Sequence, residues 1–195
     1  MATRNSYTRF MPTPDRTSLP AIVAAGQHIL ESDGLDAVTM AAVADRVGVR
    51  PPSLYKRVRN RDELIRLIAE AAVTELGAAL AQADPGGDPR ERLRAIVTAL
   101  REFARARTAA YLLVFTPLTT EPPSRELLET SSAPLFDAVA EIVDHDNVLE
   151  AARTFTAWAT GFIAMELNGS FHLGGDVDTA FAYGVERLAA AITDR

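Results

Sequence analysis

The sequence predicts an all-α protein with a small N-terminal domain and a larger C-terminal domain. Apolar residues recur every three or four positions from residue 18 almost to the end of the 195-residue chain, which is the period of an amphipathic helix. Proline and glycine gather at 84–89 (DPGGDP), where a long helix should end. Charge is also divided: residues 1–66 hold 10 Lys and Arg against 7 Asp and Glu, whereas residues 67–195 hold 10 against 19. We therefore expect a basic N-terminal domain and an acidic helical remainder.

The N-terminal segment, residues 1–17, shows no helical period and contains two prolines, so we expect a flexible arm. Arg4 and Arg9 could reach into a minor groove of DNA, as N-terminal arms sometimes do, or the arm could be a tail without a role. Ser18 and Pro20 then mark the start of the first helix of the N-terminal domain.

The next residues form a helix-turn-helix pattern. Thr39 precedes a helical stripe at 40–47, and its hydroxyl can accept a hydrogen bond from an unpaired backbone N–H there. Gly48 follows where a sharp turn requires a positive φ angle. The second helix opens with Pro51 and Pro52, which are tolerated in a first turn because the N–H groups that they lack would be unpaired there. Because the second helix of such a motif enters the major groove, we expect a DNA-binding surface.

Basic residues are concentrated around this turn. Six Lys and Arg side chains fall within sixteen positions, opposed only by Asp45, and Tyr55 lies among them. Such a cluster can neutralise phosphates and hydrogen-bond to them, although a solvated basic face on an ordinary helical domain would have the same composition. The cluster consists of Arg46, Arg50, Lys56, Arg57, Arg59 and Arg61.

The motifs of this region also occur together in a known family. They are Thr39, the pattern AxxxGV at 44–49, LYK at 54–56 and NRDEL at 60–64. On these residues, the region resembles the DNA-binding domain of the TetR family of bacterial transcriptional regulators. One departure is Val58, where the family more often has an aromatic residue. The resemblance implies a homodimer that binds a near-palindromic double-stranded DNA operator and responds to a small-molecule effector.

The candidate side chains can be given roles by their chemistry. Hydroxyl, ammonium and guanidinium groups suit phosphate oxygens, and such contacts set affinity and register. Arg50 is the candidate for a base edge, in a bidentate contact with guanine, and Pro51 or Pro52 could touch a thymine methyl group. The phosphate contacts are assigned to Thr39, Ser53, Tyr55, Lys56 and Arg61.

Asn60 begins a further helix, because Glu63 three residues on completes a capping box. The N-terminus of this helix directs unpaired N–H groups toward the position of a phosphate. We place the domain boundary inside it, with the DNA-binding domain at 18–66 and an effector-binding and dimerisation domain at 67–195. The helix can then act as a lever between the two domains.

The C-terminal domain is expected to be helical throughout. Three prolines within 116–124 indicate a loop, and Pro134 should bend or interrupt the helix that follows. Helical stripes are predicted at 90–104, 111–115, 127–143, 148–171 and 177–192.

The last two of these helices, 148–171 and 177–192, are the most apolar. Small and large apolar residues alternate around the whole circumference of the first, so it must be buried on more than one side. One side can face its own domain and the other a second copy. We therefore expect a homodimer through these two helices.

A second resemblance concerns the same region. The run WATGF at 158–162 and the pair Met165 and Glu166 resemble a subclass of TetR ligand domains with a Trp/His/Gly signature. Thr160 stands where that subclass usually has histidine, so no role of the histidine is carried over.

Aromatic and flexible apolar side chains are more numerous in the C-terminal domain than a small helical core usually requires. Core packing explains any single one of them, but the family resemblance implies that a subset lines a cavity for a largely apolar effector. Glu166, Thr160 and Asn168 are candidate polar anchors. The candidate lining residues are Phe103, Tyr111, Phe115, Trp158, Phe162, Met165 and Glu166.

No catalytic, metal or cofactor site is expected. The chain has no cysteine and no glycine-rich nucleotide-binding loop, and its three histidines are widely separated. The spacing of Glu141 and His145, beside two aspartates, is more simply an acidic loop than a metal site. No apolar run approaches the ~20 residues of a membrane-spanning helix, and we expect a cytoplasmic protein.

The sequence therefore predicts a ligand-responsive repressor that a small molecule releases from its operator. Two other classes stay open. An activator or architectural DNA-binding protein that senses nothing would keep its DNA affinity in the presence of any small molecule. A helical small-molecule-binding protein or enzyme with a vestigial helix-turn-helix would show no sequence-specific DNA binding.

Overall fold

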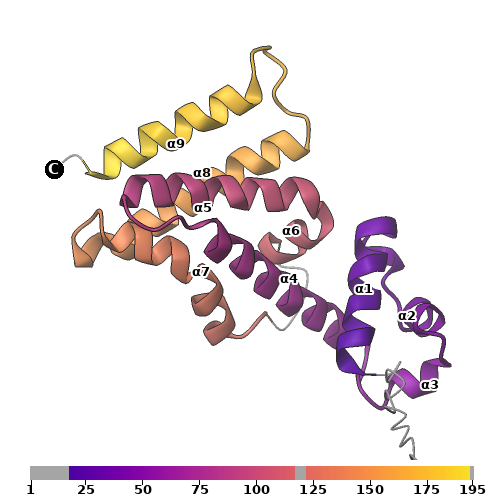
Figure 1. Ribbon diagram of the computed structural model, residues 1–195. Helices are drawn as coiled ribbons and strands as arrows, with labels where there is room; N and C mark the ends of the chain where they lie inside the picture. The colour runs from indigo at the N-terminus through magenta and orange to yellow at the C-terminus, as the bar shows by residue number, and fades with distance from the viewer. Residues whose placement is uncertain (1–17, 117–121, 194–195) are drawn as a thin grey trace, which may run out of the picture.

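The computed structural model describes residues 18–116 and 122–193, and the regular elements within these ranges are all helical (Figure 1). Three helices form a head at one end of the molecule, a long helix leads out of it, and the remaining helices build a body (Figure 1). The predicted all-α fold is therefore confirmed. The helices are α1 (Leu19–Asp33), α2 (Met40–Val47), α3 (Pro51–Leu54), α4 (Arg61–Ala83), α5 (Pro89–Ala106), α6 (Thr108–Phe115), α7 (Arg125–Ala140), α8 (Val148–Leu167) and α9 (Val177–Thr193), with short 3₁₀ helices at Leu35–Ala37 and His145–Asn147.

The starts of α2 and α4 are capped by the side chains that the sequence predicts. Thr39 Oγ1 accepts a hydrogen bond from the N–H of Ala42 at 3.1 Å, and Asn60 Oδ1 accepts one from the N–H of Glu63 at 2.9 Å. The Glu63 carboxylate accepts from the N–H of Arg59 at 2.6 Å, one residue earlier than in the expected capping box. Each cap satisfies a donor that the first turn of a helix would leave unpaired.

The buried apolar residues divide into two cores, and α4 contributes to both. Its first turns, with Leu64 and Ile68, pack into the head core, whereas Leu76 and Leu80 pack into the body core. Helix α6 also crosses the division, because Leu113 is buried in the head core. Helices α4 and α6 therefore each contribute buried residues to both cores and connect the head to the body.

Helix α7 crosses α4 at a very short distance. A Cβ atom on Gly77 would lie 2.7 Å from the Cα of Ser131, so only glycine allows this approach. We predicted that Pro134 would bend or interrupt this helix, and the interruption does not occur, because α7 continues through Pro134. Proline removes one backbone donor from a helix, and we attribute the continuity to the packing of α7 along α4, α5 and α8.

Helices α8 and α9 lie on the side of the body away from the head (Figure 1). One face of α8 is buried against its own body through Phe155, Ala159 and Ile163. Its opposite face, with Gly161 and Met165, is exposed. None of the described helices combines the length and the apolar character that crossing a bilayer requires.

Candidate DNA-binding surface and effector cavity

The turn between α2 and α3 has the geometry that the sequence predicts. Gly48 adopts a left-handed conformation with φ 75° and ψ 38°, and the N–H of Val49 donates to the carbonyl of Ala44 at 2.9 Å. Leu54 is completely buried and anchors α3 to the head core. Helix α3 is thereby held at the outer end of the head (Figure 1).

Most of the predicted DNA contacts lie on α3 or directly beside it. Ser53 is half-buried, and so is Thr39, whose oxygen caps α2 while its proton can still be donated to a phosphate. The other five candidates on or beside α3 are exposed, and they include two basic side chains and one aromatic side chain, as contact with a DNA backbone requires. They are Arg50, Pro51, Pro52, Tyr55 and Lys56.

Arg61 differs from the other candidates because its guanidinium group turns back into the head. Its Nε donates to the carbonyl of Val38 and its Nη2 to the carbonyl of Leu35, both at 2.7 Å. These bonds tie the start of α4 to the segment before α2. The geometry therefore supports a positioning role for Arg61 in place of the predicted phosphate contact. Charge pattern could not reveal this, because the two carbonyls belong to residues far from Arg61 in the sequence.

A polar cluster connects α1, α4 and α6 where the head meets the body. Arg107 pairs with Glu75 of α4 at 2.8 Å and donates to Glu31 of α1 at 3.2 Å. Gln27 of α1 donates to Glu75 at 2.7 Å. We call these four residues the junction cluster. No local sequence signal marks it, because its members come from distant parts of the chain.

The seven predicted effector-cavity residues lie in different surroundings within the described part of the chain. Trp158 and Phe162 pack against Phe181 of α9, with ring centroids 5.3 and 5.1 Å apart. They belong to the aromatic contact between α8 and α9. Phe103 is buried in the body core, whereas Met165 is 47 % exposed on the outer face of α8.

Glu166, the predicted polar anchor, is engaged in ion pairs. Arg101 donates two hydrogen bonds to its carboxylate, at 2.7 and 2.8 Å, and Arg105 donates another at 3.0 Å. The hydrogen bonds from Arg101 hold the pKa of Glu166 below its ordinary value, against the opposing effect of burial. Both arginines also pair with Asp178 of α9, at 2.8 and 2.6 Å. Glu166 therefore joins α8 to α5, and Asp178 joins α9 to the same two arginines. The Glu166 carboxylate is already engaged in these ion pairs.

A cavity of about 150 Å³ lies between α4, α5, α6, α7 and α8. Among the predicted residues, Phe115 lines it and Tyr111 packs against Phe115 with its ring tilted, the ring centroids being 4.8 Å apart. The Tyr111 hydroxyl is buried and has no hydrogen-bond partner among the described residues, and burial raises its pKa to about 12. The walls from α4 are Val73, Leu76 and Leu80. Sequence analysis missed these three because they have the same spacing as ordinary core residues.

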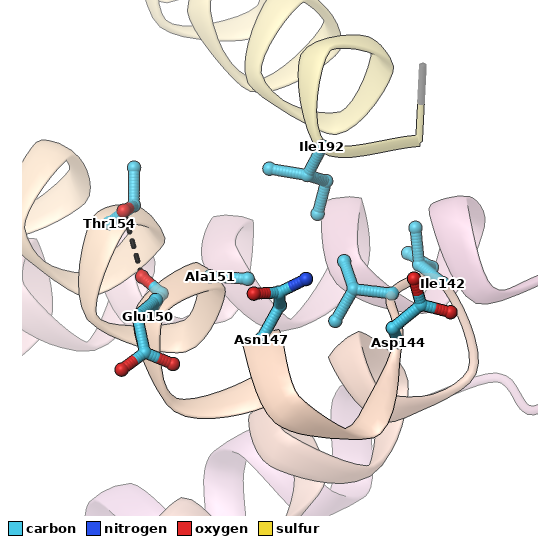
Figure 2. Close-up of a pocket in the computed structure, with 8 residues that line it drawn as sticks. Ile142, Asp144, Asn147, Glu150, Ala151, Thr154 and Ile192 are labelled. Atoms are coloured by element: carbon cyan, nitrogen blue, oxygen red, sulfur yellow. Dashed lines mark hydrogen bonds between the residues drawn. The ribbon is translucent and has the colours of Figure 1, made fainter. Parts of the chain in front are cut away.

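A second, open hollow of about 400 Å³ lies between the α7–α8 connection and the end of α9. Figure 2 shows Ile192 of α9 above the loop that carries Asp144 and Asn147. This hollow is wide open and its polar groups are exposed, so it lacks the enclosed shape of a small-molecule site. His145 in the same loop is fully exposed, and the described residues bring no three His, Asp or Glu side chains together as a metal site would require.

A helix-turn-helix with an exposed basic surface, joined by one long helix to a helical body, defines a two-domain DNA-binding protein. Residues 15–73 match the family model described as "Bacterial regulatory proteins, tetR family", and residues 93–188 match "Tetracyclin repressor-like, C-terminal domain". The chain therefore belongs to the TetR family and is a DNA-binding transcriptional regulator. That family consists of regulators and not of enzymes.

Individual relatives agree with this assignment. The chain is 29 % identical to the HTH-type transcriptional activator FasR of Mycolicibacterium smegmatis, over 76 % of this chain and 68 % of that protein. It is 26 % identical to an uncharacterised HTH-type transcriptional regulator of Mycobacterium tuberculosis, over 93 % and 84 %. Among solved structures, a Rhodococcus protein of unknown function has a TM-score of 0.77 at 20 % identity, covering 97 % of this chain and all of the other. A TetR variant from Acinetobacter baumannii in complex with minocycline has a TM-score of 0.67 at 20 % identity, over 89 % and 95 %.

Proposed function

We propose that this regulator is a repressor that binds a near-palindromic operator as a homodimer and leaves it when a small, largely apolar molecule fills the cavity. The proposal rests on the path of α4, which runs from the helix-turn-helix to the cavity. Its first residue, Arg61, holds the helix-turn-helix, and its middle supplies Val73 and Leu76 to the cavity wall. A ligand that displaces these two side chains would tilt α4 and move α3 with it.

The proposed DNA contacts follow from the exposed surface of α3. Arg50 reads a guanine edge, and Pro51 or Pro52 touches a thymine methyl group. Phosphate contacts from the hydroxyl groups and from Lys56 set affinity and register. Support comes from the exposure of Arg50 and Lys56. The phosphate contacts that we retain are those of Thr39, Ser53, Tyr55 and Lys56.

The homodimer is proposed to form through the exposed faces of α8 and α9. Ala157, Gly161 and Met165 recur one turn apart on the unburied face of α8, and Tyr183 of α9 is 63 % exposed. Exposed small and apolar residues that recur on one helix face suit contact with a second copy of the chain. In a two-fold dimer this contact sets the separation of the two α3 helices, which must be about 34 Å, or a multiple of it, to reach major grooves on one side of DNA.

We further propose a division into a DNA-binding domain at 18–66 and an effector-binding domain at 67–195. The two separate cores support a division into two parts, although the head core extends beyond residue 66 to Ile68, Ala69 and Leu113. The body is proposed to belong to the Trp/His/Gly subclass, on the evidence of Trp158 and Gly161 in α8. Arg4 and Arg9 of the proposed N-terminal arm lie outside the described residues. A cytoplasmic location follows from a role on bacterial DNA.

For the ligand to release DNA, it must bind the form that cannot bind DNA more tightly than the form that can. A shift from 1:99 to 99:1 between two forms requires a preference of about 5.5 kcal/mol. A ligand with equal affinity for both forms would leave the DNA affinity unchanged.

A second candidate function is activation of transcription. It is favoured by FasR, which is described as an activator and matches 76 % of this chain. A reporter under the bound operator separates the two, because a repressor lowers expression and an activator raises it.

The first experiment is fluorescence anisotropy of labelled DNA from beside the gene, at two salt concentrations, against a scrambled duplex. We expect tight, salt-sensitive binding that is lost in the double variant Arg50→Ala/Lys56→Ala. Arg125→Ala is the matched control, because Arg125 is an exposed arginine of α7. Equal affinity for the scrambled duplex would contradict sequence-specific recognition at this operator.

A further inference from the structure

The cavity between α4, α5, α6, α7 and α8 has no charged side chain among its described lining residues. Hydrocarbon groups form most of its surface, and the hydroxyl groups of Ser131, Ser132 and Thr156 form the polar part. An ion placed there would lose its hydration without gaining an oppositely charged partner. The walls therefore disfavour carboxylates, phosphates and ammonium compounds.

Two of the hydroxyl groups already donate their protons to backbone carbonyls. Ser132 Oγ donates to the carbonyl of Leu128 at 2.8 Å, and Thr156 Oγ1 donates to the carbonyl of Ala152 at 2.9 Å. Each hydroxyl has a single proton, so these two oxygens can only accept a hydrogen bond from a ligand. A ligand that hydrogen-bonds to Ser132 and Thr156 must therefore supply the donor.

The size of the cavity limits the ligand as well. Apolar cavities of about 150 Å³ take up a molecule the size of benzene. Phe115 and Leu128 are 39 and 43 % exposed, so the cavity is bordered by apolar side chains that reach the surface. An apolar ring therefore suits both the volume and the walls.

We propose that the effector is an uncharged, ring-sized apolar molecule that carries a hydrogen-bond donor facing Ser132 and Thr156. This inference rests on the effector control proposed above and names the chemical class that the cavity selects. The donor gives the ligand one orientation, and the apolar ring contacts the α4 residues that lead to the head.

Four probes of nearly equal size test the class: benzyl alcohol, benzyl methyl ether, benzylamine and benzoate. Their Kd values are measured by ligand-observed NMR titration of the full chain at pH 7 without DNA. Benzyl alcohol should bind, the ether should bind about fivefold more weakly because it lacks the donor, and the two ions should bind at least about tenfold more weakly. Equal binding of an ion and the alcohol, or no binding of any probe, would overturn the proposal.

Substitutions test whether the probes bind in this cavity. Leu128→Trp should fill the cavity and abolish alcohol binding, whereas Leu149→Trp should not, because Leu149 is an equally exposed leucine, also at 43 %, that does not line it. Thr156→Val keeps the shape and removes an acceptor, so the alcohol should lose its advantage over the ether. An unchanged preference in Thr156→Val, or unchanged binding in Leu128→Trp, would contradict the assignment.

Adding the operator separates this proposal from the proposed function. If benzyl alcohol binds with the expected preference but leaves DNA affinity unchanged, the ligand class stands and the effector control fails. If DNA binding is specific but the alcohol shows no preference over the ions, the regulator stands and the ligand class fails.

Discussion

Glu31, in the last turn of α1, accepts a hydrogen bond from the backbone N–H of Ala110 at 3.0 Å, in the first turn of α6. The other carboxylate oxygen accepts one from the N–H of Ala109 at 3.3 Å. A carboxylate at a helix N-terminus satisfies unpaired donors and meets the positive end of the helix dipole. Because α6 lines the cavity at its other end through Val114 and Phe115, one short helix extends from the head to the cavity.

Replacing Glu31 by glutamine should weaken this connection. The variant keeps an acceptor oxygen but loses the charge at the helix end and the ion pair with Arg107, so we expect a loss of about 0.5–1 kcal/mol in unfolding free energy. Urea unfolding measures it. Glu129→Gln removes a surface ion pair with Arg125 on α7 and is the control. Equal effects of the two substitutions would argue against a special role of the Glu31 cap.

Arg50 and Lys56 should affect DNA binding in different ways. Lys56→Ala removes a phosphate contact, so affinity should fall similarly on all sequences and the salt dependence of log K should decrease by about one. Arg50→Ala should also relax sequence preference at one base pair, at a cost of about 1–3 kcal/mol. Anisotropy on a panel of operator variants checks both. The assignment of Arg50 fails if its loss is the same on every sequence.

Arg61→Ala should act on stability and not directly on the phosphate contacts. The substitution removes both hydrogen bonds. The carbonyl of Leu35 keeps the bond that it accepts from the N–H of Val38, whereas the carbonyl of Val38 loses the donor from Arg61, which costs about 1–3 kcal/mol in the head. Urea unfolding should show the loss in the absence of DNA. Unchanged stability together with a salt slope lower by one would restore the phosphate contact that the sequence predicts.

Gly161→Arg should separate the protomers without unfolding them. A Cβ atom on Gly161 has no neighbour within 4 Å, so the protomer has room for a longer side chain. In a two-fold dimer through α8 the same position would bring two arginines together across the interface. Sedimentation velocity should show a monomer, whereas Thr130→Arg on the exposed face of α7 should leave the assembly intact. A dimeric Gly161→Arg variant would move the interface elsewhere.

The ion pairs of Glu166 predict loss of stability in acid. Hydrogen bonds from Arg101 lower the pKa of Glu166 from its ordinary 4.5, and a hydrogen bond from Arg105 lowers the pKa of Asp178. A carboxylate whose pKa is lowered by folding stabilises the folded state above its unfolded pKa, and this contribution disappears as the pH falls through the folded pKa. Unfolding free energy should therefore decrease below a pH of about 4.5.

Glu166→Gln removes one of these titrating groups, so the acid slope should become shallower. Thermal unfolding between pH 7 and pH 3 provides the comparison with the unchanged chain. An identical slope in the variant would show that Glu166 contributes nothing to the acid response.

The sequence by itself determined the helices and the helix-turn-helix. The caps at Thr39 and Asn60, the left-handed turn at Gly48 and the proline start of α3 all depend on residues within about one helical turn. The exposure of the basic and aromatic side chains on and beside α3 could be predicted for the same reason. Pro134 is an exception to such local prediction. A proline inside a helix is expected to bend or interrupt it, but α7 continues through Pro134, which we attribute to packing against other helices.

Only the tertiary structure decided which side chains meet. Arg61 reaches back to carbonyls before α2, Glu166 pairs with arginines of α5, and Glu31 closes the start of α6. The cavity likewise needs side chains from five helices. A helix or a turn is specified by neighbouring residues, whereas the role of a side chain depends on partners that folding brings from distant positions.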